Sequence, residues 1–155
     1  MQPTEPAETS AIRDSLGTAL VRAAREHRVL VSRGLTELGL HPGQELLLAE
    51  LWKEDGVTQT ELTARLGVEL PTVVKAVQRL EASGLVTRRK DPRDRRVTRV
   101  HLTEQGGGLR FAVETVWTRT EDLMLRGLED RQVRALREAL DVLHRNLSEE
   151  RWPQH

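Results

Sequence analysis

Two short helix signals separated by a glycine turn, with an arginine-rich segment directly after them, constrain this fold most. The first signal is Thr58-Gln59-Thr60-Glu61, which has the form of a capping box: a hydroxyl that accepts from the amide three residues on, and a carboxylate that reaches back. Gly67 is suited to end this helix, and Pro71 marks the start of the next. Two short helices joined in this way are typical of a helix-turn-helix.

Helical spacing gives way to strand character after Gly84. Residues 85–87 and 97–102 are rich in β-branched side chains, and the second run partly alternates, so we expect the two strands of a hairpin. The connecting loop, 91–96, is polar, contains a proline and carries three arginines outward. Helix, turn, helix and basic hairpin, in that order, predict a winged helix-turn-helix.

Two helices are expected before this module. Apolar residues from Ala11 onward recur at three- or four-residue steps and indicate one long helix, which Gly39 ends. Pro42 is well placed to open a second helix that runs to about Lys53. The first nine residues carry two prolines and almost no large apolar side chain, so we expect a disordered tail there.

Two more helices are expected after the hairpin. Thr103 can cap the first, which reaches about Gly127, and the glycines at 106–108 loosen its opening turns at a cost of roughly 1 kcal/mol each relative to alanine. The last helix carries an apolar stripe formed by Val133, Leu136, Leu140, Leu143 and Leu147. A small winged domain cannot cover this stripe, so we expect a second subunit to pack on it; an intramolecular bundle is the alternative.

Composition excludes several classes of protein. The 155 residues include no cysteine, which removes disulfides, thiolate zinc sites and thiol nucleophiles. No apolar run approaches the roughly 18 residues that span a bilayer, and the acidic, proline-bearing start is unlike a signal peptide. We therefore expect a cytoplasmic protein.

Charge is unevenly spread along a chain whose net charge is zero. Residues 57–102 hold ten Lys/Arg against five acids, and seven of the fourteen residues 86–99 are basic. A basic middle flanked by acidic ends is typical of a surface that binds a polyanion. The alternative is an arginine-rich segment that is merely solvated.

Double-stranded DNA fits this arrangement, because a helix about 10–12 Å wide enters the major groove while an arginine-tipped wing reaches the adjacent minor groove. Asp94, beside two arginines, can hold a guanidinium in one orientation. Glu69 would either cap the second helix or exclude phosphate. The expected DNA-binding residues are Thr58, Gln59, Pro71, Thr72, Lys75, Arg79, Arg88, Arg93, Asp94, Arg95 and Arg96.

The expected fold is mainly α with a small β-hairpin wing: a winged helix-turn-helix core plus N- and C-terminal dimerisation helices. Its segments are a disordered tail over 1–9, N-terminal helices for dimerisation and core over 10–54, the winged helix-turn-helix DNA-binding module over 55–102, C-terminal dimerisation helices over 103–150 and a tail over 151–155.

Enzymatic function finds no support in the sequence. The triple glycine lacks the frame of a phosphate-binding loop, the five histidines show no paired-ligand spacing, and no Gly-x-Ser-x-Gly is present. With no tyrosine and one phenylalanine, the chain also lacks the stacking aromatics of single-strand or RNA readers. We expect no enzyme, no cofactor and no metal.

The segment from Val57 to Gly106 resembles the winged-helix core of the MarR family of bacterial transcription regulators. The resemblance is carried by Leu80-Glu81-Ala82-Ser83-Gly84-Leu85-Val86, by Asp91-Pro92-Arg93-Asp94-Arg95-Arg96 and by Leu102-Thr103-Glu104-Gln105-Gly106. It implies an obligate homodimer, joined through its first and last helices, on pseudo-palindromic operators. Pro71, Thr72 and Lys75 resemble the recognition-helix contacts, and Arg95 or Arg96 resembles the arginine placed in the minor groove.

Many members of this family respond to small aromatic or phenolic ligands in a cleft between the helical dimer region and the winged core. The residues that could surround such a cleft here are His27, Arg28, His41, Trp52, Phe111 and Trp117, although each alone is more often core or surface. The predicted function is a sequence-specific repressor, released from double-stranded DNA by a small, for example phenolic, ligand. The alternative is a dimeric ligand-sensing or protein-interaction module that does not bind DNA specifically.

Overall fold

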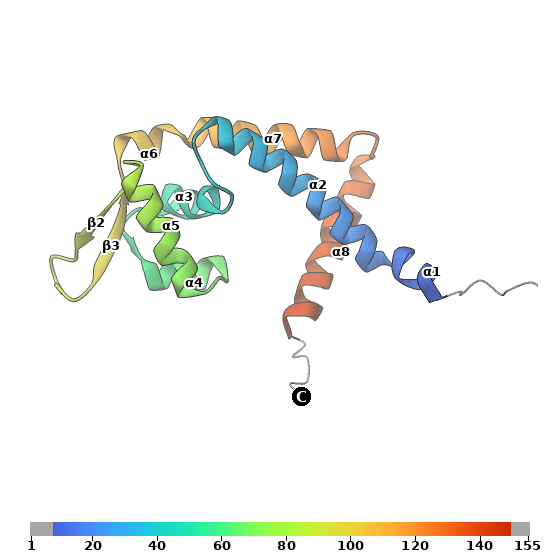
Figure 1. Cartoon of the computed structure of the whole chain (residues 1–155), viewed down its shortest axis with the longest axis horizontal. Coiled ribbons are helices and arrows are strands. Elements are labelled where there is room, and N and C mark those ends of the chain that lie inside the picture. The colour runs from blue at the N-terminus through green and yellow to red at the C-terminus, as the bar shows by residue number, and fades with distance from the viewer. Residues whose placement is uncertain (1–7, 150–155) are drawn as a thin grey trace, which may run out of the picture. The chain divides into compact units, whose positions relative to one another are not determined.

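The computed structural model describes residues 8–149, within which eight helices and three strands follow one another (Figure 1). In chain order they are α1 (Glu8–Arg13), α2 (Leu16–Glu37), α3 (Gln44–Lys53), β1 (Val57–Thr58), α4 (Gln59–Leu66), α5 (Leu70–Ala82), β2 (Val86–Lys90), β3 (Thr98–Leu102), α6 (Glu104–Gly108), α7 (Arg110–Leu125) and α8 (Asp130–Glu149). None of these helices is both long and apolar enough to cross a membrane.

The two expected tails fall mostly outside the described residues. The C-terminal one, 151–155, lies outside them entirely, as do residues 1–7 of the N-terminal one. Residues 8 and 9, which we expected in that tail, belong to α1.

The first helical region is two helices rather than the single one that apolar spacing predicted. The break follows Arg13, because Ser15 has extended backbone angles and caps α2: its hydroxyl accepts a hydrogen bond from the amide of Thr18 at 3.1 Å. Periodicity alone did not reveal this cap, since the apolar spacing runs on across it.

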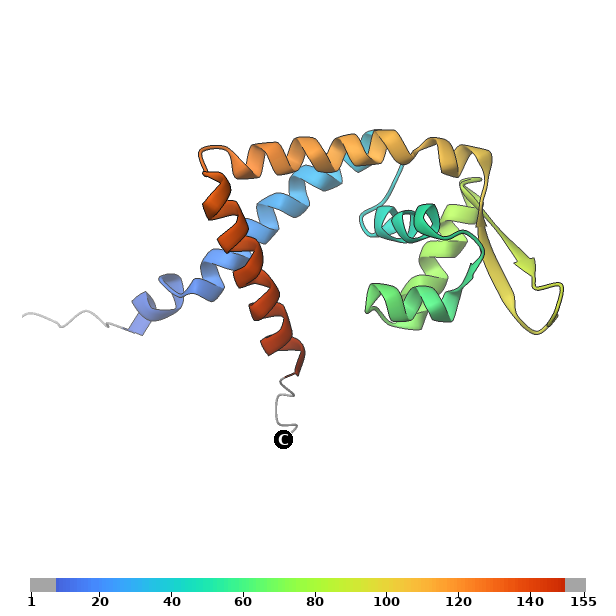
Figure 2. The same cartoon turned by 180° about the vertical axis from the view of Figure 1, so that it is seen from behind.

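The helix-turn-helix forms as its capping signals predict. Thr58 and Glu61 make both hydrogen bonds of the capping box at the start of α4, and Gly67 ends that helix in the left-handed conformation at φ 63°. α5 then begins with Pro71 in its first turn. The predicted hairpin is also present, and Figure 2 shows it from behind, extending away from α4 and α5.

The sheet has three strands in the order β1-β3-β2, with both pairings antiparallel. β2 extends to Lys90, further than its β-branched residues predicted, because Lys90 pairs with Thr98 across the hairpin. β1, which pairs Val57 with Val100, was not predicted: two residues carry no readable alternation.

One hydrophobic core joins the helices and the sheet in the first of the chain's two compact units, which spans residues 1–120. Leu35 of α2, Leu48 of α3 and Leu62 of α4 are fully buried in it. The same core holds Val77 of α5 and Val100 of β3, so α5 and the hairpin are anchored in one closely packed core.

Gly106 marks a close approach between α6 and the start of the hairpin. A Cβ at Gly106 would lie 2.0 Å from the backbone oxygen of Leu85, while the Gly106 oxygen accepts a hydrogen bond from the Trp52 indole at 3.0 Å. The expectation that this glycine merely loosens a helix start is therefore wrong. Thr103 does cap the helix, which ends at Gly108 before α7 begins.

The second compact unit, 121–155, includes the end of α7 and all of α8. Arg137 and Glu121 form an ion pair at 3.6 Å within it. No described residue of α8 is buried, and Leu140 is 41% exposed. Of the apolar stripe predicted for this helix, Leu136, Leu140 and Leu147 are exposed, whereas Val133 and Leu143 are half-buried.

Candidate nucleic-acid interface

The exposed face of α5 carries the expected recognition residues. Val73, Val77 and Leu80 bury the opposite face, which leaves Thr72, Lys75 and Arg79 exposed on consecutive turns. This spacing follows directly from the 3.6-residue period of the helix.

Glu69 occupies the position that begins α5, but its side chain makes no cap. Only its backbone oxygen accepts hydrogen bonds, from the amides of Thr72 at 3.0 Å and Val73 at 3.3 Å. Of the two roles considered for Glu69, side-chain capping is thus wrong. Its exposed carboxylate places negative charge beside the amino end of α5.

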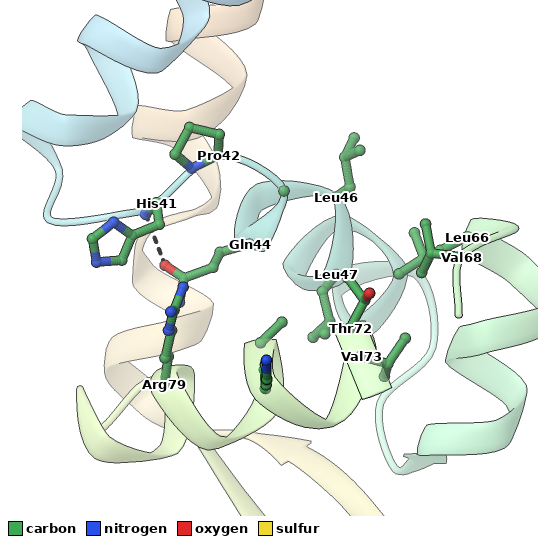
Figure 3. Close-up of a pocket in the computed structure, with 13 residues that line it drawn as sticks. His41, Pro42, Gln44, Leu46, Leu47, Leu66, Val68, Thr72, Val73 and Arg79 are labelled. Carbon is green, nitrogen blue, oxygen red and sulfur yellow. Dashed lines mark hydrogen bonds between the residues drawn. The ribbon is translucent and has the colours of Figure 1, made fainter. Parts of the chain in front are cut away.

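A cavity of about 260 Å³ adjoins the exposed face of α5 (Figure 3). Its lining comes from the residues leading into α3, from the first turn of α3, from the end of α4 and from α5. It includes apolar side chains such as Leu46 and Val68 and the polar Thr72 and Arg79. His41 also lines this cavity. Its position is fixed by its backbone N–H, which donates to Gln44 Oε1 at 2.8 Å. His41 therefore lies beside the recognition residues.

The hairpin loop is ordered by two aspartates. Asp91 Oδ1 accepts from the amides of Arg93 at 2.7 Å and Asp94 at 3.3 Å. Asp94 Oδ1 accepts in turn from the backbone N–H of Arg96 at 3.0 Å and from its guanidinium Nε at 3.3 Å. The Arg96 side chain is 93% exposed. Of the two arginines considered, Arg96 is the one that Asp94 contacts; Arg93 and Arg95 are exposed beside it.

Three of the expected DNA contacts are engaged or enclosed inside the protein. The Thr58 hydroxyl caps α4, and the amide nitrogen of Gln59 is buried with no hydrogen-bond partner. Arg88 donates from Nε and Nη2 to Glu81 at 2.9 and 2.6 Å, and these bonds hold the pKa of Glu81 below its ordinary value. Thr58 and Arg88 therefore make bonds within the winged core, although Arg88 remains exposed to solvent.

Sequence analysis did not single out Arg99, whose guanidinium contacts three other parts of the winged core. Its Nε lies 2.5 Å from Asp91 Oδ2, and its Nη1 donates to the Gly56 oxygen at 2.9 Å and lies 4.0 Å from Glu61 Oε2. The hydrogen bond from Arg99 lowers the pKa of Asp91 to about 2. Only the hairpin register, which pairs Arg89 with Arg99, brings these groups together.

The six expected ligand-site residues do not form one site. His27, Arg28 and Trp117 line a cavity of about 490 Å³ between α2, the start of α3 and α7, where the His27 and Trp117 rings lie 5.4 Å apart. Trp52 instead lines an adjoining cavity of about 320 Å³, with Trp117 as a shared wall. Phe111 is 81% exposed and lines neither of these cavities.

Glu45 lines both of the cavities beside Trp117 and was not predicted as a site residue. It is only 5% exposed, and its Oε2 accepts from the Gly43 amide at 2.7 Å. Burial raises the pKa of this carboxyl. A group of three or more histidine, aspartate or glutamate side chains suited to a metal ion is absent from residues 8–149.

Comparison with known proteins places this geometry among transcriptional regulators. The sequence model of the MarR family matches residues 40–98. A MarR transcriptional regulator from Methanosarcina mazei Go1 is 28% identical, with a TM-score of 0.76 over 86% of this chain and 96% of the other. CouR from Rhodococcus jostii RHA1, solved with p-coumaroyl-CoA, is 28% identical, with a TM-score of 0.74 over 86% of this chain and 94% of its own.

A MarR family transcriptional regulator from Listeria monocytogenes, in complex with a 26mer DNA, shares the fold. It is 19% identical, with a TM-score of 0.77 over 92% of this chain and 99% of its own.

Proposed function

This chain belongs to the MarR family of transcriptional regulators, and we propose that it binds a pseudo-palindromic site in double-stranded DNA as a homodimer and represses transcription by occluding that site. One observation carries the proposal: the core that anchors α5 also anchors a hairpin whose tip presents Arg96. Lys75 and Arg79 then face the major groove while Arg96 enters the minor groove. The Listeria protein, which has the same fold, was solved in complex with a 26mer DNA.

We assign the minor-groove contact to Arg96 rather than to Arg95. Asp94 accepts from both the backbone and the guanidinium of Arg96, which reduces the number of orientations that this exposed side chain samples. A guanidinium held in this way loses less conformational entropy when it enters a narrow groove.

The homodimer is supported by the exposed apolar side chains of the terminal helices. On α8 they include Leu136, Leu140 and Leu147, and on α1 and α2 they include Ile12, Leu16, Leu20 and Val21. A monomer in water would leave these faces uncovered. A second copy covers them, and it also sets two recognition helices about 34–36 Å apart on one face of the duplex.

Release by a small ligand is proposed at the cavities that share Trp117. Arg28 can meet a carboxylate, and His27 and Trp117 supply ring surface for an aromatic group. CouR, which holds p-coumaroyl-CoA, supports an aromatic acyl group as one kind of ligand. Calorimetry with a panel of phenolic acids tests this directly, and the absence of heat across the panel would count against it.

Fluorescence anisotropy of a labelled duplex from the gene's own upstream region tests DNA binding. The protein is titrated at two salt concentrations beside a scrambled duplex. We expect a strong preference for the native duplex and affinity that falls steeply with salt, because each neutralised phosphate releases counterions. Arg96→Ala should weaken binding about tenfold or more, which is the size of effect expected when the contacts to one base pair are lost. Arg95→Ala is the matched control and should weaken binding less.

Equal and weak binding of both duplexes would contradict the proposal. The exposed carboxylate of Glu69 beside α5 would then be read as excluding phosphate. In that case a dimeric module that senses a ligand or binds a protein becomes the better interpretation.

A further inference from the structure

Arg99 joins three separate parts of the winged core. It lies on β3, and its guanidinium contacts Asp91 at the start of the hairpin loop, the Gly56 oxygen in the turn before β1, and Glu61 in the first turn of α4. The hairpin loop and the helix-turn-helix are therefore linked through a single side chain.

The link continues in both directions through hydrogen bonds. Toward the helices, Glu61 Oε2 accepts from the Thr58 amide at 2.6 Å and closes the capping box of α4. Toward the hairpin tip, Asp91 accepts from the amide of Asp94, and Asp94 holds Arg96. A continuous chain of polar contacts thus runs from the start of α4 to the exposed Arg96 of the loop.

The chemistry of the site requires arginine. A guanidinium presents several N–H donors in a rigid fork, so it can meet a carboxylate and a backbone oxygen at once, whereas an ammonium is a single point charge. The Asp91 side chain is only 12% exposed. Nε and Nη1 of Arg99 are both used for bonds inside the protein, so the guanidinium is held by the core itself.

We propose that Arg99 is a positioning residue for DNA binding, which acts through Asp91 and Asp94 to hold Arg96 at a fixed place relative to the recognition helix. This inference rests on the proposed function. Arg99 touches no DNA itself; it determines where the minor-groove arginine lies when α5 is seated in the major groove.

A double-mutant cycle between two residues that do not touch is the sharpest test. Arg96→Ala, Arg99→Gln and the double variant are titrated against the labelled upstream duplex. We expect Arg99→Gln to weaken binding about 5- to 30-fold, the range for loss of charge-assisted hydrogen bonds. On that background Arg96→Ala should add little, because the arginine is no longer held. Full additivity of the two effects would overturn the proposal.

The salt dependence of binding separates positioning from contact. Arg99→Gln should leave the slope of log K against log salt unchanged, whereas loss of a phosphate contact lowers it by about 0.9. A reduced slope would make Arg99 a direct DNA contact and contradict the proposal. Arg99→Lys keeps the charge without the fork, so we expect it to remain impaired.

Hydrogen exchange in the free protein tests the same residue without DNA. The Asp91 amide donates to the Val97 oxygen across the hairpin, and the Val97 amide donates to the Asp94 oxygen within the loop. Both amides should exchange faster in Arg99→Gln while α8 amides are unchanged. Asp91→Asn removes the same ion pair from the other side and should reproduce the effect if Arg99→Gln does not fold. If the native protein fails to bind the duplex, the proposed function fails; unchanged hairpin exchange in a folded variant overturns the positioning role by itself.

Discussion

Single residues in this protein are constrained in ways that depend on distant parts of the chain. Gly106 is the clearest case: in the sequence it is the first of three glycines, yet only it lies against the backbone of Leu85. Gly107 and Gly108 have open space where a Cβ would stand. Identical residues in a row therefore carry different requirements.

Gly106→Ala should destabilise the protein strongly, because the new methyl would overlap a backbone oxygen that cannot rotate away. We expect a loss of about 3 kcal/mol or more, at or above the upper end for overpacking, measured by chemical denaturation. Gly107→Ala is the matched control, since alanine has the better helix propensity, and it should be neutral or stabilising by up to about 1 kcal/mol. Equal effects of the two substitutions would show that the close approach to Leu85 is not limiting.

Glu45 is a buried carboxyl whose pKa is raised by burial. The folded state therefore holds its proton more tightly than the unfolded state, so stability falls as pH rises from the ordinary pKa of 4.5 through the raised value. Glu45→Gln keeps an oxygen for the Gly43 amide and removes the charge. We expect its melting temperature at pH 7 to exceed that of the native protein by a few degrees, with the difference shrinking below pH 4.5. A variant less stable at pH 7 would contradict this.

At the scale of elements, the hairpin depends on pairing and on charge together. β3 lies between β1 and β2, and its Arg99 is bonded to Asp91 beyond the end of β2. Local pattern predicted the two hairpin strands, because β-branched residues and a polar loop are local signals. β1 and the contact between Arg99 and Asp91 depend instead on how the strands pair with one another. A local sequence pattern does not contain that information.

Asp91 should make the hairpin sensitive to acid in one pH range. Its pKa is lowered from 3.8 to about 2, so its contribution is complete above pH 3.8 and is lost as pH falls toward 2. Amide exchange or chemical shifts of the loop, followed in that range, should show the native hairpin loosening, whereas Asp91→Asn should start loose and change little. A native hairpin and an Asp91→Asn hairpin that respond alike to acid would rule out this account.

At the scale of the whole molecule, the apolar stripe of α8 leaves Leu136, Leu140 and Leu147 exposed. Leu140→Glu should give a monomer, because a charge in an apolar interface is left without a partner. Half-sites are then bound one at a time, so operator affinity should drop about a hundredfold or more. Sedimentation and anisotropy measure both effects. Glu138→Lys, on the opposite side of α8, is the control; a dimeric Leu140→Glu variant would contradict the proposed interface.

Local rules account for most of the elements and for part of the candidate interface. The helix-turn-helix was predictable because Thr58, Glu61 and Gly67 cap α4 through bonds to residues no more than one or two helical turns away. The exposed face of α5 followed from helical periodicity. Periodicity could not show that Arg88 is engaged by Glu81, or that His41 lies apart from His27, because both facts depend on how separate elements pack.

Caps, turns and apolar spacing are short-range properties, so the sequence alone was enough to predict where the helices of the winged core begin and end, and to predict the hairpin with its basic loop. The same segment carries the resemblance to the MarR family. The charge pairs were visible only in the folded chain: Asp94 contacts Arg96, and Arg99 links the hairpin to α4. The folded chain was also needed to show that Glu45 is buried between two cavities. The physical reason is that hydrogen bonds and burial depend on distances between atoms, and residues far apart in the chain come within those distances only when the elements pack.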